Sequence, residues 1–216
     1  MAELITGLEA DVVRRNLDAI REDVGHGVQI LAAIKYVATE ELGVLAEAGV
    51  TLVGENRAQA LQEKHAALGP AFTWDFIGHL QSRKVKDVVP LVRLIHSVGS
   101  ESALDRLDRL GPEGRGDVRV LLEVNVAQEE GKSGFAPADL PAMLERAAAA
   151  GVPVDGLMTM PPLAPRAEDN RRWFAALAEL AGAHGLRELS MGTSQDYAVA
   201  AAEGATIVRI GSSLYR

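Results

Sequence analysis

Residues 28–42, VQILAAIKYVATEEL, join an apolar run to a lysine and then to a polar stretch. The run 28–34 is almost entirely apolar, which is typical of a strand that is buried on both faces. Lys35 stands directly after this run, and the chain turns polar from Thr39. An ammonium group is costly to bury without a partner. A lysine at the end of a buried strand therefore needs a structural or a chemical reason.

The same alternation of a short apolar run and a longer amphipathic stretch repeats along the chain. Runs rich in Val, Ile and Leu predict strands near 28–36, 50–54, 73–78, 93–98, 118–126, 154–160, 187–192 and 205–211. Helices between them supply the crossover connections that parallel strands need. Eight such strands favour an α/β fold of the closed (β/α)8 TIM-barrel type. No linker divides the sequence, so we expect a single domain over residues 1–216.

Several stretches between these runs carry helix signals. Residues 39–49 begin at a capping Thr39 and end at Gly49. Residues 137–151 begin with a proline, which suits the first turn, and end with a glycine. The stretch 168–185 places on one helical face Trp173, Leu177, Leu180 and Ala181. We expect no helix after the last strand, and the opening helix within 7–25 covers the gap that this leaves.

The composition excludes several classes of function. Hydrophobic residues make up 48% and charged residues 24%, as in an ordinary globular protein. A net charge of −8 without a basic run argues against nucleic-acid binding and against a polybasic membrane surface. A small anionic ligand remains compatible with an acidic chain, because local backbone amides can bind it. The absence of cysteine excludes disulfides, thiolate catalysis and cysteine metal sites.

Targeting and metal signals are also missing. The N-terminus has no basic flank followed by an apolar core, and no apolar run approaches the ~18 residues of a membrane span. The five histidines show no metal-binding spacing such as HExxH. We therefore expect a cytoplasmic protein without a metal site.

Lys35 occupies a position where a barrel places its chemistry. Side chains alternate inward and outward along a barrel strand, so Lys35 shares a face with Ala33 and Leu31. It then points into the mouth formed by the C-terminal ends of the strands, where barrel enzymes carry their active sites. Two interpretations stay open. The ammonium can reach water while its stem packs, or the amine can form a Schiff base with an aldehyde.

The C-terminal block 189–216 indicates a phosphate site. Ser194 fits an N-cap with Asp196 in the first helical turn, and a plain cap is the alternative to a ligand contact. Arg209 points inward from an apolar strand, which is costly unless it meets an acceptor. The loops after the last two strands are the usual phosphate cradle of this fold. Ser194, Gly211 and Ser212 could therefore share one phosphate.

Three further features each have a structural alternative. Asn56 follows the second strand at the barrel mouth, and it could equally cap a helix over 57–69. His79 follows the third strand, where a lone histidine more often anchors a loop than acts as a base. Residues 131–133, Gly-Lys-Ser, imitate the end of a nucleotide-binding loop, but its first glycine is replaced by Val126. We reject that motif.

Taken in order, these segments resemble the pyridoxal phosphate homeostasis protein family. The matching segments cover nearly the whole chain: IKY (34–36), GENRAQALQEK (54–64), FIGHLQSRKVK (76–86), IHSV (95–98), EVNVAQEEGKSGF (123–135), GLMTMPP (156–162) and most of 189–215. The resemblance implies a barrel similar to the N-terminal domain of alanine racemase, with pyridoxal 5′-phosphate (PLP) as its cofactor.

The resemblance also implies a role for each site residue. Lys35 would form the aldimine, Arg209 would face the pyridine nitrogen and Asn56 would lie beside the ring. The phosphate would be held by Ser194, Gly211 and Ser212. His79 and Lys132 match family positions without a role that we can assign.

This chain departs from the family pattern at several positions. Ile34 and Tyr36 replace the Ser or Thr that often flank the lysine, and Arg83 replaces an Asn. Thr193 stands where a Met is usual, and Ser212 stands for a Thr and keeps its hydroxyl.

The same residues distinguish a carrier from an enzyme. PLP enzymes draw electrons into a protonated ring, whereas an arginine disfavours a second positive charge beside it. Alanine racemase supplies a second tyrosine base from a further domain of a partner subunit. We expect no such domain here, and by alternation Tyr36 should point away from Lys35. Tyr197 and Tyr215 are no obvious second base either.

We therefore expect no catalytic residue. The predicted protein holds PLP reversibly and delivers or buffers it, with PLP-dependent apo-enzymes as recipients, and is a monomer or weak homodimer. It would serve vitamin B6 and amino-acid homeostasis. A minimal PLP-dependent amino-acid racemase or isomerase is the alternative. A phosphosugar barrel enzyme would leave Lys35 and Arg209 without roles.

Overall fold

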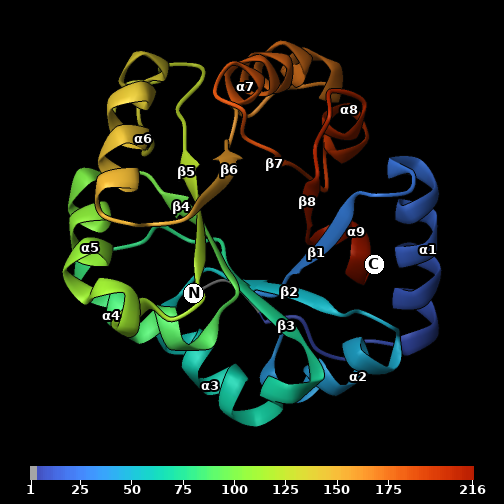
Figure 1. Ribbon diagram of the computed structural model, residues 1–216. Helices are drawn as coiled ribbons and strands as arrows, with labels where there is room; N and C mark the ends of the chain where they lie inside the picture. Colours follow the sequence, from blue (N-terminus) through green and yellow to red (C-terminus); the bar gives the residue numbers. More distant parts are fainter. Residues whose placement is uncertain (1–3) are drawn as a thin grey trace.

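The strands of the protein close into a parallel eight-stranded barrel (Figure 1). The computed structural model describes residues 4–216. Each strand pairs with its neighbours in the chain, and pairing of the first with the last closes the ring. The strands are β1 (Gln29–Ala33), β2 (Leu52–Glu55), β3 (Thr73–Phe76), β4 (Leu94–Val98), β5 (Arg119–Glu123), β6 (Val154–Met158), β7 (Glu188–Thr193) and β8 (Ile207–Ile210). The (β/α)8 barrel and its predicted strands are confirmed.

Helices surround this barrel on the outside (Figure 1). They are α1 (Ala10–Val24), α2 (Leu42–Glu47), α3 (Ala58–Leu68), α4 (Val85–Val88), α5 (Glu101–Arg115), α6 (Leu140–Ala149), α7 (Arg171–Ala183), α8 (Tyr197–Ala202) and α9 (Ser212–Tyr215). Short 3-10 turns join some of them: η1 (Thr39–Glu41), η2 (Gly69–Ala71), η3 (Ser82–Lys84), η4 (Val89–Leu91), η5 (Pro137–Asp139) and η6 (Ala167–Asn170). Within residues 4–216, no helix combines the length and apolar character needed to cross a bilayer.

The opening helix α1 covers the last sector of the barrel, as the sequence indicated. It lies beside α9 (Figure 1), and the Asn16 side chain donates hydrogen bonds to the carbonyls of Leu214 and Arg216. Tyr197 on α8 donates to Asp23 at 2.7 Å from the other side. The prediction that no helix follows the last strand was wrong, because one helical turn, α9, follows β8.

Several predicted boundaries also need correction. Thr39 caps no α-helix: it opens the 3-10 turn η1, and α2 begins only at Leu42. On α7 the centre of the buried face is Phe174, whereas Trp173 is only partly buried. Most of the strands end before the apolar run does. These runs continue into turns at the barrel mouth, where Ile34 and Val124 stay buried and Lys35 and Ile77 are partly buried.

The inside of the barrel holds its own apolar layer, separate from the core between barrel and helices. Its members come from most of the strands: Leu31, Leu52, Leu94, Leu121, Met158 and Ile207. The outer core is larger and packs the helices on the barrel. The inner layer fills the barrel interior beneath the mouth, so ligands are confined to the end where the strands finish.

Gly192 lets β7 turn sharply into the loop that precedes α8. Its φ of +88° lies in the left-handed region, and a Cβ there would stand 2.6 Å from the Cβ of Ala200. Alanine at this position meets both backbone strain and a clash with a buried helix.

We expect Gly192→Ala to lower the free energy of unfolding by about 1–3 kcal/mol more than Gly185→Ala does. Gly185 has a comparable φ of +66°, but a Cβ added there would meet open space. Alanine at position 185 therefore meets the backbone strain without the clash. Urea unfolding of both variants measures the difference. Equal losses would show that the contact with Ala200 carries no cost.

Candidate functional site

A pocket of about 540 Å³ opens at the C-terminal end of the barrel. Its walls come from the ends of β1, β2, β3, β6, β7 and β8 and from the chain beside them. The lining residues are Ile5, Ala33, Lys35, Tyr36, Asn56, Ile77, Met160, Thr193, Ser194, Gln195, Arg209, Gly211, Ser212, Tyr215 and Arg216. Every residue that the sequence nominated for cofactor binding is among them.

The charge of this pocket is opposite to that of the whole chain. Lys35, Arg209 and Arg216 line it, and none of the described lining residues is Asp or Glu. The chain as a whole carries a net charge of −8. Cations gathered in a concave, partly dry site attract an anion far more strongly than exposed ones do. The pocket therefore suits a small anionic ligand.

Lys35 lies in a turn two residues beyond the end of β1. The last ladder bond runs from Ile34 N to the Gly54 carbonyl at 3.0 Å, and Val37 N closes the turn on the Ile34 carbonyl. The expectation that Tyr36 points away from Lys35 was wrong, because the alternation of a strand ends at Ala33. The Lys35 Nζ lies 4.6 Å from the centroid of the Tyr36 ring, which is a cation–π contact.

A buried ion pair fixes the two chain segments that carry Lys35 and Asn56. Lys64 on α3 donates to the Ile34 carbonyl and to Glu55 Oε2, both at 2.6 Å. Glu55 Oε1 accepts from the backbone N–H of Asn56 at 2.7 Å and is 3.2 Å from that of Arg57. Glu55 is fully buried and Lys64 nearly so. Sequence analysis missed this pair, because its partners come from different elements.

Asn56 presents a polar atom without a partner. Its Oδ1 is buried and makes no hydrogen bond to the described residues, 4–216. The alternative role as a helix cap does not hold, because α3 begins at Ala58 and Arg57 occupies the N-cap position. A buried amide oxygen without a partner is costly, so this side chain is left to meet a ligand.

The segments after β7 and β8 meet around the hydroxyl of Ser194. Its Oγ accepts from Gly211 N at 3.0 Å and from Ser213 N at 3.2 Å. The prediction of Ser194 as an N-cap was wrong, because α8 begins only at Tyr197. Backbone amides that converge on one oxygen form a ready binding place for a phosphate oxygen. Ser212 lines the pocket beside them.

The loop that carries Ser194 is held from behind by Asp196. The Asp196 Oδ1 accepts from Thr193 N at 2.7 Å, and its Oδ2 accepts from Asn170 Nδ2 at 2.8 Å. Asp196 precedes α8 instead of lying in its first turn as predicted. The carboxylate, which is almost fully buried, thus fixes the loop. Asn170 ends the 3-10 turn η6 directly before α7, and its role could not be recognised from its sequence position.

Arg209 is buried on β8 and meets acceptors from β7 and from the segment directly after β6. Its Nη1 donates to the carbonyl and hydroxyl of Ser190 at 2.7 and 2.6 Å. Its Nη2 donates to the Thr159 carbonyl and to Met160 Sδ, both at 2.9 Å. Burial lowers the pKa of Arg209 to about 10, against the opposing effect of Asp196 and Glu123. The guanidinium therefore remains charged at neutral pH.

The other tyrosines differ in their access to the pocket. Tyr215 lines it, but its hydroxyl donates to the Ala33 carbonyl at 3.1 Å, and burial holds the pKa of this phenol above its usual range. Tyr197 bonds to Asp23 outside the pocket. Tyr36 is 42% exposed, so among the described tyrosines it alone combines exposure with a place in the pocket wall.

The remaining candidates from the sequence lie elsewhere. His79 is exposed, and Lys132 pairs with Glu129 in the loop after β5. Neither lines the pocket. No helix follows residues 131–133 until α6 begins at Leu140, as expected from rejection of the nucleotide motif. Among residues 4–216, no group of three or more His, Asp or Glu side chains is placed to hold a metal ion.

Removal of one partner of the buried ion pair should be severe. We expect Lys64→Met to lower the free energy of unfolding by about 3–5 kcal/mol, because it leaves the Glu55 carboxylate buried and uncompensated. The matched control is Lys132→Met, which breaks a partly exposed pair and should cost less than about 1 kcal/mol. Urea unfolding of both measures this. A Lys64→Met loss as small as that of the control would contradict the assignment.

Comparisons with known proteins agree with this geometry. The family described as alanine racemase, N-terminal domain, matches residues 8–216. A pyridoxal phosphate homeostasis protein of Aquifex aeolicus is 38% identical over 205 residues, which cover 90% of each chain. One from Pseudomonas aeruginosa is 39% identical over 195 residues, which cover 87% of this chain and 84% of the relative.

A solved structure of PipY from Synechococcus elongatus with PLP bound is 34% identical. It superposes with a TM-score of 0.84 over 94% of this chain and 100% of that one. The curated homologues and the domain family both lead to the same assignment. The chain belongs to the alanine racemase N-terminal domain family and, within it, to the pyridoxal phosphate homeostasis proteins.

Proposed function

We propose that this chain binds PLP in the pocket at the barrel mouth and serves intracellular PLP (vitamin B6) and amino-acid homeostasis. In this proposal the whole of residues 1–216 acts as one cofactor-binding domain in the cytoplasm. One observation carries it. An amine from the end of β1 and a converging set of amides and hydroxyls after β7 and β8 line the same cationic pocket. The PLP-bound relative and the names of the curated homologues support the same assignment.

The residues present fit the chemical groups of PLP. Lys35 supplies an amine that can bond reversibly to the cofactor aldehyde with loss of water. Ser194, Gly211 and Ser212 supply donors for the phosphate. The partnerless Oδ1 of Asn56 marks a buried amide that is free to contact the ring. A non-covalent phosphate site and a reversible covalent bond together suit a protein that must both retain and release its ligand.

Arg209 favours a carrier over an enzyme. Bound PLP supplies an electron sink when its ring nitrogen is protonated. A charged guanidinium near that nitrogen disfavours a second positive charge. Arg209 keeps its charge despite burial, and the described pocket walls contain no carboxylate to replace it. We therefore propose a non-catalytic role, in which the chain acts as a monomer or weak homodimer and PLP-dependent apo-enzymes are its recipients.

One observation favours a second candidate function, a minimal amino-acid racemase or isomerase. Tyr36 lines the pocket beside Lys35 instead of pointing away from it. A partly exposed phenol near the lysine is a candidate for a second acid–base group. Arg209 does not exclude slow proton transfer, so the two functions are separated by experiment.

The purified protein should turn yellow with PLP, because the visible band depends on the bond between the cofactor and Lys35. We expect Lys35→Ala to abolish the visible band, and borohydride reduction of the wild type to fix the cofactor on the peptide containing Lys35. Lys86→Ala, an exposed lysine on α4, is the control and should behave as the wild type. A protein that stays colourless with excess PLP would refute the proposal.

The phosphate loop gives an independent test. Ser194→Ala should weaken PLP binding by about tenfold or more, because a hydrogen bond to a charged group contributes about 1.5–3 kcal/mol. The visible band should persist at saturating PLP, since Lys35 is unchanged. Titration of the band with PLP measures both. Wild-type affinity in Ser194→Ala would place the phosphate elsewhere.

The carrier and the racemase differ in their action on amino acids. With L-alanine in D2O, we expect the PLP-loaded protein to exchange the α-hydrogen no faster than its Lys35→Ala variant, as followed by proton NMR. Fast exchange that is lost in both Lys35→Ala and Tyr36→Phe would instead establish an enzyme with Tyr36 as its second base.

A further inference from the structure

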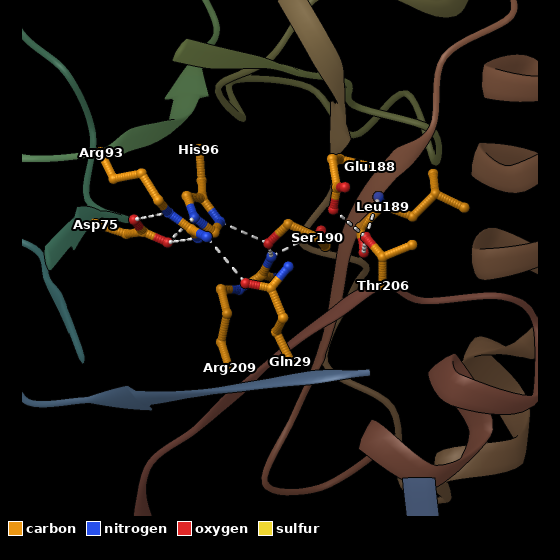
Figure 2. Close-up of polar contacts among 9 residues, drawn as sticks. All are labelled: Gln29, Asp75, Arg93, His96, Glu188, Leu189, Ser190, Thr206 and Arg209. Atoms are coloured by element: carbon orange, nitrogen blue, oxygen red, sulfur yellow. Dashed lines mark hydrogen bonds and ion pairs between the residues drawn. The ribbon is translucent and has the colours of Figure 1, made fainter. Parts of the chain in front are cut away.

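A chain of polar side chains leads from Arg209 through the barrel to its opposite end (Figure 2). The hydroxyl of Ser190 on β7 lies 2.6 Å from Arg209 Nη1 and 2.8 Å from His96 Nδ1. His96, on β4, places its Nε2 3.0 Å from Asp75 Oδ2 on β3. Asp75 in turn accepts from Nε and Nη2 of Arg93 at 3.1 and 2.7 Å.

The two ends of this chain fix its direction. A guanidinium only donates and a carboxylate only accepts. Ser190 Oγ therefore accepts from Arg209, and its single hydrogen points to Nδ1 of His96. His96 must then be neutral, with its proton on Nε2 directed to Asp75. Any reversal would face a lone pair with a carboxylate or leave a buried hydroxyl hydrogen without an acceptor.

The chain is deeply buried. Ser190 and Asp75 are 0% exposed, as is His96, and an apolar inner layer surrounds them. Burial lowers the pKa of His96, the Asp75 carboxylate opposes this, and the cations of Arg209 and Arg93 reinforce it. Buried polar groups of this kind are weak evidence for stability alone. Their direct link to a pocket residue indicates a role in the site.

The chain also determines which donor Arg209 offers to the pocket. The guanidinium has five N–H groups. Nη1 directs its pair to Ser190, and Nη2 directs its pair to Thr159 and Met160. Within residues 4–216, no hydrogen bond engages Nε–H. Because the hydroxyl hydrogen of Ser190 points to His96, the lone pairs of its Oγ are directed toward Nη1 of Arg209.

We propose that His96 is a positioning residue for Arg209, acting through Ser190 and anchored by Asp75. The chain orients the guanidinium so that its Nη groups bind protein and its Nε–H is left for the cofactor ring nitrogen. This inference rests on the proposed function, because it assigns how Arg209 is presented to bound PLP. It concerns residues outside the pocket wall, none of which the sequence nominated.

The protonation state of His96 can be measured without the cofactor. We expect ¹⁵N NMR of histidine-labelled protein to show the His96 signal, assigned by its loss in His96→Gln, as the neutral Nε2–H form across about pH 5 to 8. An imidazolium or an Nδ1–H form in this range would overturn the proposed direction of the chain.

The effect of His96 on the pocket is measured through the affinity for PLP and through the visible band of bound PLP. We expect His96→Met to weaken PLP binding about tenfold. It should also move the midpoint of the visible band's pH response upward by about one unit, because a displaced cation opposes ring protonation less. Glu123 and Asp196, whose charges act on Arg209, and Lys35 in the same pocket remain in place. The shift of the midpoint therefore reports on the hydrogen-bonded row of polar side chains. If His96→Met does not fold, Ser190→Ala takes its place as the test. It deletes one hydroxyl and should weaken PLP binding and raise the midpoint in the same direction.

Three controls separate positioning from a structural role. His96→Gln keeps one acceptor and one donor and should lie between wild type and His96→Met. In an Arg209→Met background, His96→Met should cause no further change, since coupled residues are non-additive. Arg115→Met removes a buried arginine that binds the carbonyls of Leu107, Ala150 and Gly151; it should lower stability and leave the band unchanged.

The outcomes distinguish the two proposals. Wild-type protein that forms no band with PLP refutes the proposed function. Wild-type protein that forms the band, together with an unshifted band and unchanged affinity in His96→Met or Ser190→Ala, overturns only the positioning role. Additive effects in the double variant, or no recovery in His96→Gln, overturn it as well.

Discussion

Closure of the barrel by parallel pairing of β1 with β8 is the constraint on which the site depends. The register sets Leu31 opposite Arg209 and Ala32 opposite Ile210. The turn with Lys35 and the segment of Gly211 and Ser212, which are far apart in sequence, are therefore brought to one mouth. If the sheet stayed open, the amine and the phosphate donors would lie at opposite edges. A closed ring brings them together without any direct bond between them.

The pocket is a local reversal of the protein's charge. The chain carries a net charge of −8, while the mouth gathers cations in a concave pocket. Carboxylates near this mouth are already engaged by protein groups. Glu55 is neutralised by Lys64, and Asp196 is used by Thr193 and Asn170. The cations that face the pocket are thus left to an anionic ligand, whereas the acids serve to hold the loops.

Buried polar networks give this small site its rigidity. The Glu55–Lys64 pair ties the ends of β1 and β2, and the chain from Arg209 to Arg93 crosses the barrel interior. A ligand that is held by a reversible bond needs fixed protein partners, because a displacement of about 1 Å in those groups weakens the orientation of the ligand. Rigidity behind the pocket and openness at its mouth suit a protein that holds and releases its ligand.

The sequence by itself determined the alternation of strands and helices, because hydrophobic period is a local property, and the eight strands in chain order favoured the closed barrel. It also nominated six of the residues that line the pocket. It failed where strand geometry ends. Alternation could not place Tyr36, which lies in a turn, and capping preference misplaced Ser194 and Thr39. Only the tertiary structure decided the link from Arg209 through Ser190 to His96, because β4 and β7 are far apart in sequence. A hydrogen bond across a barrel depends on the register of its strands and on which side chains face one another, and no local pattern encodes either.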